Sequence, residues 1–357
     1  MSERPGSVPQ LQEAIRGLAS VRFVGRGSKT GLKPSAGEGT RLDLMNISGI
    51  VEYRPDECIV SARAGTRLTD IDAALSAHGH YLPFDPPLVD AGASLGGTIA
   101  AGLSGPGRYR YGGVRDFLLG AAFVDGNGRL VRSGGKVVKN AAGFYLHNML
   151  VGSLGRFGAL VEITVKVFPR PDARVTVRGD FPGQPAALEA LARVAMGKLD
   201  CEALDFEPPA TIWARIAGFA EALPPRVERL RSVMGGETDT IAATEDENCW
   251  RKAREFSWVP EATPLVKIAT TPERIEPLER RFAGDEGKRR YSVGGNVAWI
   301  AWRGSLDALG TILGEEGLAG LVVLGEPRCA LIGAPTKTDF SRRIKQALDP
   351  EGRFGEL

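Results

Sequence analysis

A glycine-rich loop near the start of the chain carries the clearest chemical signal. The stretch VGRGSKTGLK, Val24–Lys33, combines closely spaced glycines with the donor side chains of Ser28, Lys29 and Thr30. Glycine lets a backbone approach an anion closely and turn several N–H groups toward it. The pattern predicts a strand-to-loop segment that holds phosphate, although a surface turn rich in small residues would read the same way.

This loop differs from the two best-known phosphate loops. A dinucleotide fingerprint needs G-x-G-x-x-G opening directly into a helix, whereas the glycines here are Gly25, Gly27 and Gly31, with Pro34 close behind. A Walker A loop needs G-x-x-x-x-G-K-[ST], and Thr30 stands where its second glycine belongs. The loop alone therefore indicates a phosphate without saying which molecule carries it.

Composition narrows the class of protein. The chain has 357 residues, 43% of them hydrophobic and 25% charged, which is typical of a globular protein with two domains. Its 45 basic and 43 acidic residues leave a net charge of +2, so we expect no general affinity for nucleic acid or anionic lipid. The first ten residues lack a signal-peptide pattern, and no window approaches the ~18 apolar residues that span a bilayer. We expect a cytoplasmic protein that acts on small molecules.

The cysteines do not predict a metal centre. The four are far apart and form no C-x-x-C pair, unlike the ligands of iron–sulfur and zinc sites. They are Cys58, Cys201, Cys249 and Cys329. An iron–sulfur cluster working with this chain must therefore come from a partner.

Apolar patterns in the first half predict short strands around a helix. We expect strands at Val21–Val24, Ile50–Tyr53 and Cys58–Ala64, and then a helix capped by Thr66 and ended by Gly79. This order of elements is α+β and not a regular βαβ repeat.

Two further strand signals follow. The turn sequence Asp125-Gly-Asn-Gly128 lies between two apolar runs and predicts a hairpin. Leu160–Phe168 alternates, with valines and Ile163 on one face and polar residues on the other. The prolines of FPRPDAR, Phe168–Arg174, then mark a stop and an extended connector, so we place a domain boundary there.

A second glycine-rich block makes the phosphate loop interpretable. Asp90–Pro171 begins DAGASLGGTIAAGLSGPGRYRYGG and, together with the first loop, resembles the flavin-binding domain of the vanillyl-alcohol oxidase/p-cresol methylhydroxylase (PCMH-type) flavoprotein family. Within that family, the order and sequence of its blocks are most similar to those of the FAD-binding E subunits of bacterial glycolate oxidases. The resemblance is strong over about residues 20–170 and weak over Arg342–Phe354. Several blocks that match in order are more specific than one glycine pattern.

The resemblance implies a fold and a cofactor. The fold is α+β, with a PCMH-type FAD-binding domain of two α/β subdomains at residues 1–170. A smaller cap-like α+β domain on the substrate side follows at 171–340, and a segment at 341–357 returns to the first domain. The phosphate of the opening loop would then be the diphosphate of FAD.

Site residues carry over position by position. The diphosphate loop would comprise Gly25, Arg26, Gly27, Ser28, Lys29, Thr30 and Gly31. The turn along the flavin and its ribityl chain would comprise Ala93, Ser94, Gly96, Gly97, Thr98, Ala101 and Gly102. Ile163, on the strand after Gly155 and Gly158, matches a position at the adenine half, and Gly158 is assigned to the cofactor with it. Ala101 and Ile163 would also be ordinary core residues in most folds.

Departures from the family matter as well. Many relatives attach FAD covalently through a histidine in or near the first loop, or through a histidine or cysteine near the flavin. The only histidines here are His78, His80 and His147; they lie outside both blocks, and we expect them at the surface or as caps. FAD is therefore expected to bind non-covalently. The histidine-rich signature of the cap domain is absent too, so no catalytic base is identified.

One carboxylate anchor remains as a weak candidate. Arg115 follows the flavin turn, and a guanidinium donates two parallel hydrogen bonds to a carboxylate. A local ion pair between Arg115 and Asp116 that holds a turn explains the same residues and is the favoured interpretation.

Two classes of function compete. The first is a redox subunit whose FAD takes or relays electrons from glycolate or a similar small 2-hydroxy acid, with a catalytic FAD subunit and an iron–sulfur subunit as partners. Membrane contact would be at most peripheral, at the inner membrane and through those partners. The second is an assembly subunit that keeps the flavin fold without chemistry. A stand-alone oxidase of another hydroxy acid or sugar is a third possibility. The intact glycine loops favour the first class, and the missing histidines keep the second open.

Overall fold

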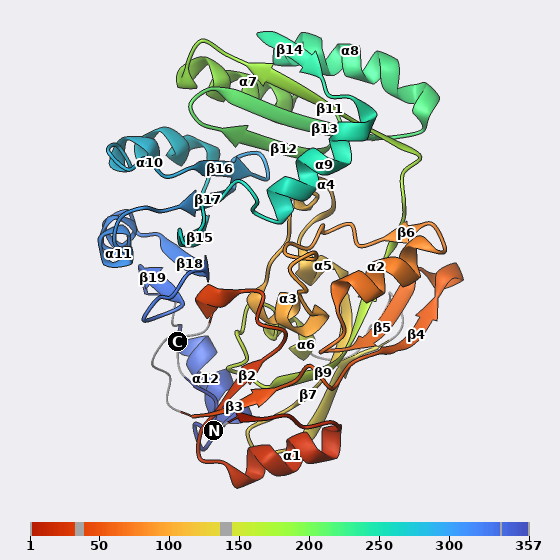
Figure 1. Ribbon diagram of the computed structural model, residues 1–357, viewed down its shortest axis with the longest axis vertical. Helices are drawn as coiled ribbons and strands as arrows, with labels where there is room; N and C mark the ends of the chain where they lie inside the picture. Colours follow the sequence, from red (N-terminus) through yellow and green to blue (C-terminus); the bar gives the residue numbers. More distant parts are fainter. Residues whose placement is uncertain (1, 33–38, 136–144, 336–337, 356–357) are drawn as a thin grey trace.

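The strands form two large antiparallel sheets and two small ones. The computed structural model describes residues 2–32, 39–135, 145–335 and 338–355. In Figure 1 the chain runs from a lower part, built mainly from the first 170 residues, to an upper part built from the rest, and then back down to the lower part. The α+β prediction is confirmed.

A small parallel sheet forms one edge of the lower part. Its order is β1 (Ser2–Glu3), β3 (Thr40–Asp43), β2 (Val21–Val24). Helix α1 (Val8–Gly17) packs on it through Leu11 and Ile15, which are fully buried. The predicted strand before the glycine loop therefore has the expected bounds.

The second sheet of the lower part is antiparallel and five-stranded. Its members, in spatial order, are β4 (Ile50–Arg54), β5 (Ile59–Arg63), β9 (Ala159–Lys166), β7 (Leu118–Val124) and β8 (Leu130–Gly134). The predicted hairpin is confirmed, since Val124 pairs with Leu130 around the expected turn. Helix α3 (Leu95–Ala101) packs on β5 and β9. The two-stranded sheet joins β6 (His80–Tyr81) to β10 (Phe168–Pro169), and the short helices are α4 (Arg108–Tyr111), α5 (Val114–Phe117) and α6 (Leu146–Met149).

The start of helix α2 (Leu68–Ser76) corrects one prediction. Its N-cap is Arg67 and not Thr66. The Thr66 hydroxyl instead donates to the carbonyl of Arg63 at 2.7 Å and accepts from the N–H of Gly49 at 2.9 Å. A threonine that ties two loops together has no hydroxyl left for the helix.

The upper part is a nine-stranded antiparallel sheet. Its order is β14 (Glu237–Thr240), β11 (Ala173–Asp180), β13 (Thr211–Gly218), β12 (Cys201–Glu207), β16 (Arg289–Ser292), β17 (Val297–Ala301), β15 (Leu265–Ala269), β18 (Ala319–Leu324) and β19 (Leu331–Gly333). One face packs on α7 (Gln184–Met196), α8 (Leu223–Met234), α10 (Ile275–Arg281) and α11 (Leu306–Glu315). Helix α9 (Ala243–Arg254) lies on the other face, between the sheet and the lower part (Figure 1). Sheet membership changes between Pro169 and Ala173, but the division into domains stays a prediction.

The end of the chain packs beside its beginning. The chain continues past α12 (Asp339–Leu348) to Phe354, which forms a β-bridge with Val21 of β2. The Phe354 ring is 1% exposed and lies 4.9 Å from the ring of Phe23, centroid to centroid. Arg353 donates to the carbonyls of Ile15, Arg16 and Leu18. The terminal segment thus closes the core under the glycine loop.

We predict that Phe354→Ala lowers the free energy of unfolding by about 3–5 kcal/mol, because it leaves a cavity in this core. Urea unfolding measures the change. Phe340→Ala is the matched control, since Phe340 is 61% exposed and its truncation should cost no more than about 0.5 kcal/mol. Equal losses in both variants would contradict the role given to the terminal segment.

Candidate functional site

A long cleft lies where the glycine loop faces α3. It is lined by the consecutive segment 22–29 and by residues of α3, of the loop before β9 and of β9 itself. Its empty volume, including the space open to solvent, is about 980 Å³. The residues that line it come from β2 of the small parallel sheet, from α3 and from β9 of the five-stranded sheet, and Figure 1 shows where these elements lie.

Two glycines allow the walls of the cleft to touch. A Cβ on Gly25 would lie 2.6 Å from Ser94 Oγ, and a Cβ on Gly96 would lie 2.7 Å from Ala64 Cβ. Ser94 itself caps α3 by accepting from the N–H of Gly97 at 3.2 Å. Gly27 has a φ of +72°, a conformation that side chains with a Cβ rarely adopt. The loop is therefore a narrow backbone cradle, as a bound diphosphate would require.

Lys29 is a buried cation on the wall of this cleft. Its residue is 7% exposed, and its Nζ lies 3.4 Å from Thr98 Oγ1 and 3.5 Å from Ser28 Oγ. Within the described residues no carboxylate lies within 4.0 Å of it. Burial lowers the pKa of Lys29 from 10.5 to about 8, and the charge of Glu255 opposes this only in part. Because buried charges are normally paired, the cleft fits an anionic ligand such as the FAD diphosphate.

Ten of the predicted cofactor residues line the cleft. They are Gly25, Arg26, Gly27, Ser28, Lys29, Ser94, Gly96, Gly97, Ala101 and Gly158. Arg26 also donates to the carbonyl of Gly65 at 3.0 Å, which anchors the loop to the segment after β5. The two glycine blocks, distant in sequence, are therefore brought together as the resemblance implied.

Six predicted residues lie outside the cleft lining and have other contacts. Thr30 Oγ1 accepts from the N–H of Gly325, and a Cβ on Gly31 would lie 2.6 Å from the carbonyl oxygen of Val322. These two positions join the loop to the upper sheet. Gly102, with a φ of +62°, ends α3. The others are buried: Ala93, Thr98 and, in the centre of β9, Ile163.

The histidines correct a second prediction. His78 is exposed, as expected, but His80 and His147 are buried. His80 Nδ1 lies 2.6 Å from the Tyr53 hydroxyl, and His147 Nδ1 lies 3.1 Å from Ser133 Oγ. Burial lowers the pKa of His147. Neither of these two is a surface residue or a cap, because each is held inside the lower part by a hydroxyl.

Arg115 and Asp116 are both exposed on α5. The Asp116 carboxylate accepts from the N–H of Gly113 at 2.7 Å, so the turn is held by a backbone contact and not by the predicted ion pair. Arg115 lines neither this cleft nor the second one described next.

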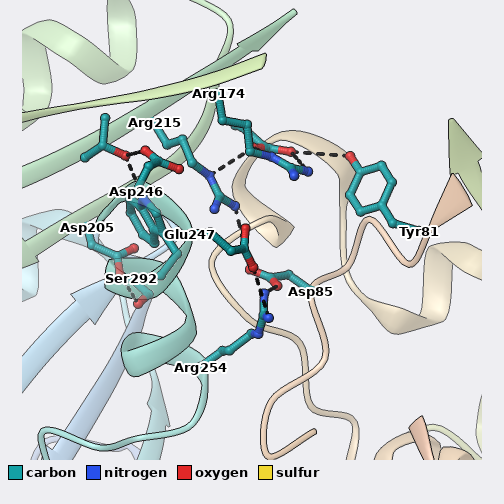
Figure 2. Close-up of polar contacts among 12 residues, drawn as sticks. Tyr81, Asp85, Arg174, Asp205, Arg215, Asp246, Glu247, Arg254 and Ser292 are labelled. Carbon is teal, nitrogen blue, oxygen red and sulfur yellow. Dashed lines mark hydrogen bonds and ion pairs between the residues drawn. The ribbon is translucent and has the colours of Figure 1, made fainter. Parts of the chain in front are cut away.

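A second cleft, which the sequence did not reveal, lies between the lower part and the nine-stranded sheet. Arg174 binds Glu202 through two contacts of 2.8 and 3.0 Å, and Arg215 Nε lies 2.9 Å from the same carboxylate. Burial alone would raise the pKa of Glu202, but Arg215 and Arg174 outweigh it and lower that pKa. Asp85 enters from the lower part (Figure 2). The one sequence signal was an arginine amid apolar residues in TIWARIAG, Thr211–Gly218.

Neither a metal centre nor a membrane helix is found in the described segments. No group of three or more histidine, cysteine or acidic residues there could hold a metal ion. No helix among those segments is both long and apolar enough to cross a bilayer.

The comparisons with known proteins are consistent with an FAD site at the first cleft, which faces the glycine loop. Residues 3–134 match a family described as an FAD binding domain. The chain is 33% identical to glycolate oxidase subunit GlcE of Escherichia coli K12, over 97% of this chain and 94% of that protein. It is 27% identical to a D-lactate dehydrogenase of Archaeoglobus fulgidus, over 93% and 84%. The structure of alkyldihydroxyacetonephosphate synthase shares the fold, with a TM-score of 0.71 at 13% identity over 98% of this chain and 74% of that one.

We predict that Gly27→Val weakens FAD binding about 5- to 150-fold, because the side chain strains a backbone at positive φ and blocks its N–H groups, at a cost of about 1–3 kcal/mol. Flavin fluorescence titration measures the affinity. Gly317→Val is the matched control, since Gly317 has a φ of +65° with open space around it and lies outside the cleft. An unchanged affinity in Gly27→Val would exclude the loop as the diphosphate cradle.

A second prediction concerns pH. The folded-state pKa of Lys29, about 8, lies below its ordinary value of 10.5. Between these values the unfolded chain therefore binds more protons, and the stability of the FAD-free protein rises with pH. Lys29→Met should remove up to about 3 kcal/mol of that rise, stabilise the FAD-free protein at pH 7 and weaken its FAD binding.

Urea unfolding of the FAD-free protein at pH 7 and 10 measures this rise. The exposed Lys252→Met should leave it unchanged. A rise of the same size in wild type and Lys29→Met would refute the assignment of a desolvated ammonium.

Proposed function

This chain belongs to the PCMH-type FAD-binding family that includes glycolate oxidase subunit GlcE, and from that membership we propose that it is the FAD-carrying subunit of a dehydrogenase complex for glycolate or a related 2-hydroxy acid. The observation that carries the proposal is Lys29, a buried ammonium on the cleft wall with only hydroxyl groups within hydrogen-bond distance in the described residues. A flavin fold that had lost its cofactor would have no reason to keep such a charge desolvated.

The residues of the cleft divide the work of binding. Lys29 supplies positive charge to the diphosphate, and the backbone N–H groups of the loop Gly25–Ser28 supply hydrogen bonds. Ser94, Gly96 and Gly97 supply a wall without bulky side chains, against which a flat ring and its ribityl chain can lie. FAD, when bound, supplies the two-electron oxidation of a 2-hydroxy acid to a 2-oxo acid.

We assign FAD binding without a covalent bond. No histidine or cysteine is among the residues that line the cleft in the described part of the chain. Arg26, Ser28 and Lys29 are the polar side chains of the loop there, and none of them forms the flavin links used by covalent relatives. The cofactor is therefore held by charge, hydrogen bonds and fit.

The partners of this chain follow from what the complex must do. The name of the relative GlcE describes a subunit, which supports a complex of several chains. We propose that one partner is a catalytic FAD subunit and another an iron–sulfur subunit, because a reduced flavin can pass its electrons one at a time to a one-electron carrier such as an iron–sulfur cluster. We place the complex in the cytoplasm, with contact to the inner membrane made through its partners.

We predict that the purified chain binds FAD and releases it on acid denaturation. The absorption spectrum of the supernatant after acid precipitation checks this result. Flavin that stays in the pellet would contradict non-covalent binding. A colourless protein that cannot be loaded with FAD would favour the assembly subunit instead.

We also predict that the FAD-loaded chain alone does not reduce a dye acceptor with glycolate or D-lactate, and that turnover appears when its partner subunits are added. Among the described residues, no histidine or carboxylate lines the FAD cleft to take the hydroxyl proton. Steady dye reduction by the chain alone would overturn the subunit assignment in favour of a stand-alone oxidase.

A further inference from the structure

The second cleft holds an arginine that is buried and only partly satisfied. Arg215 is 3% exposed, and its guanidinium stacks 4.9 Å from the ring centroid of Trp250. Its Nε faces Glu202, while neither Nη atom has a hydrogen-bond partner in the described residues. Nη2 lies 3.9 Å from Asp85 Oδ2. The arginine is thus fixed by stacking on one side and leaves donors directed into the cleft.

The matching acceptor is Asp85, which is 8% exposed. Its Oδ1 accepts from Arg254 Nη1 at 3.1 Å, whereas its Oδ2 is buried without a hydrogen-bond partner. Figure 2 shows Arg215 and Arg254 approaching this carboxylate from two sides. Asp85 also adopts a φ of +53°, and such strained positions often cluster at ligand sites.

The overall charge of the cleft limits what it can bind. Its lining contains four arginines and four carboxylates, so the charges balance: Arg170, Arg174, Arg215 and Arg254 against Asp72, Asp85, Glu202 and Glu247. A polyanion such as a nucleotide would find no excess of positive charge there. A small monoanion that also donates a hydrogen bond would give the Nη atoms of Arg215 an acceptor and would give Asp85 Oδ2, which has no hydrogen-bond partner, a donor.

We propose that this cleft binds a small 2-hydroxy carboxylate. Its carboxylate accepts from the Nη atoms of Arg215, and its hydroxyl on the adjacent carbon donates to Asp85 Oδ2. The choice of ligand rests on the proposed function, but the site itself does not, because the two clefts share no lining residue. It is a binding site separate from the FAD cleft, and no chemical step is assigned to it.

The mouth and walls of the cleft suit this ligand. Arg170 Nη2 lies 3.6 Å from Asp72 Oδ1. Both side chains are partly exposed, so they lie on the solvent side of the cleft. Tyr81 and Asp85 come from the lower part, while Arg174 and Arg215 come from neighbouring strands of the nine-stranded sheet. A ligand held by Asp85 and Arg215 therefore contacts both parts of the chain. Its affinity depends on how the two parts are positioned relative to each other.

Calorimetric titration of the FAD-loaded chain with glycolate, acetate and inorganic phosphate tests the proposal. We expect glycolate to bind, and acetate and phosphate to bind at least about tenfold more weakly, because they lack a carboxylate with a neighbouring hydroxyl. Arg215→Gln should weaken glycolate about 10- to 100-fold. Asp85→Asn should reduce the preference for glycolate over acetate, and it serves as the second variant if Arg215→Gln fails to fold.

Arg178→Gln is the matched control, since Arg178 also stacks on a tryptophan, Trp213, but lies outside the cleft. It should keep the wild-type affinity. Absence of glycolate binding, equal binding of acetate or phosphate, or unchanged binding in both cleft variants would overturn the proposal. Failure to bind FAD would instead count against the proposed function, and glycolate binding would remain measurable in the FAD-free chain.

Discussion

The cofactor cleft depends on the burial of one ammonium group, that of Lys29, because a desolvated charge is costly unless an anion pairs with it. Lys29 sits between the glycine loop and α3, with the hydroxyls of Ser28 and Thr98 as its only close polar contacts in the described residues. Glu255, the one charge that raises its pKa, is half-buried, and its carboxylate accepts from the N–H of Val89 at 2.7 Å. Glu255 follows α9, so the upper part of the chain contributes to the potential at the cofactor cleft.

Local sequence signals predicted the elements whose structure depends on nearby residues. The strand Val21–Val24, the hairpin around Asp125–Gly128 and the loop between Gly25 and Gly31 follow from turn chemistry and apolar alternation over a few residues. The glycines of the sequence indicated where the backbone is closely approached, but not which group of the structure approaches it. Gly31 faces a backbone carbonyl of β18 and Gly102 ends a helix, although both were assigned to the cofactor.

Long-range pairing could not be predicted in the same way. Asp85 and Arg215 are 130 positions apart, and each looks like an ordinary charged residue in its own segment. His80 and His147 were misjudged for the same reason, because their burial depends on tyrosine and serine hydroxyls from other elements. A single sequence records such residues but not the sheet order that brings them together.

The nine-stranded sheet shows why the charged cleft calls for a functional explanation. Toward the lower part, the β15 and β17 region buries Leu265 and Trp299 in the shared core, and its one ammonium group, Lys267, donates to the carbonyl of Gly102 at 3.2 Å. On the same side, the β11–β13 region carries Arg174, Arg215 and their carboxylates under α9. Apolar residues in place of a buried ion cluster are often as stable or more stable. Packing between the two parts therefore does not require these charges, whereas selective binding of a small polar anion does.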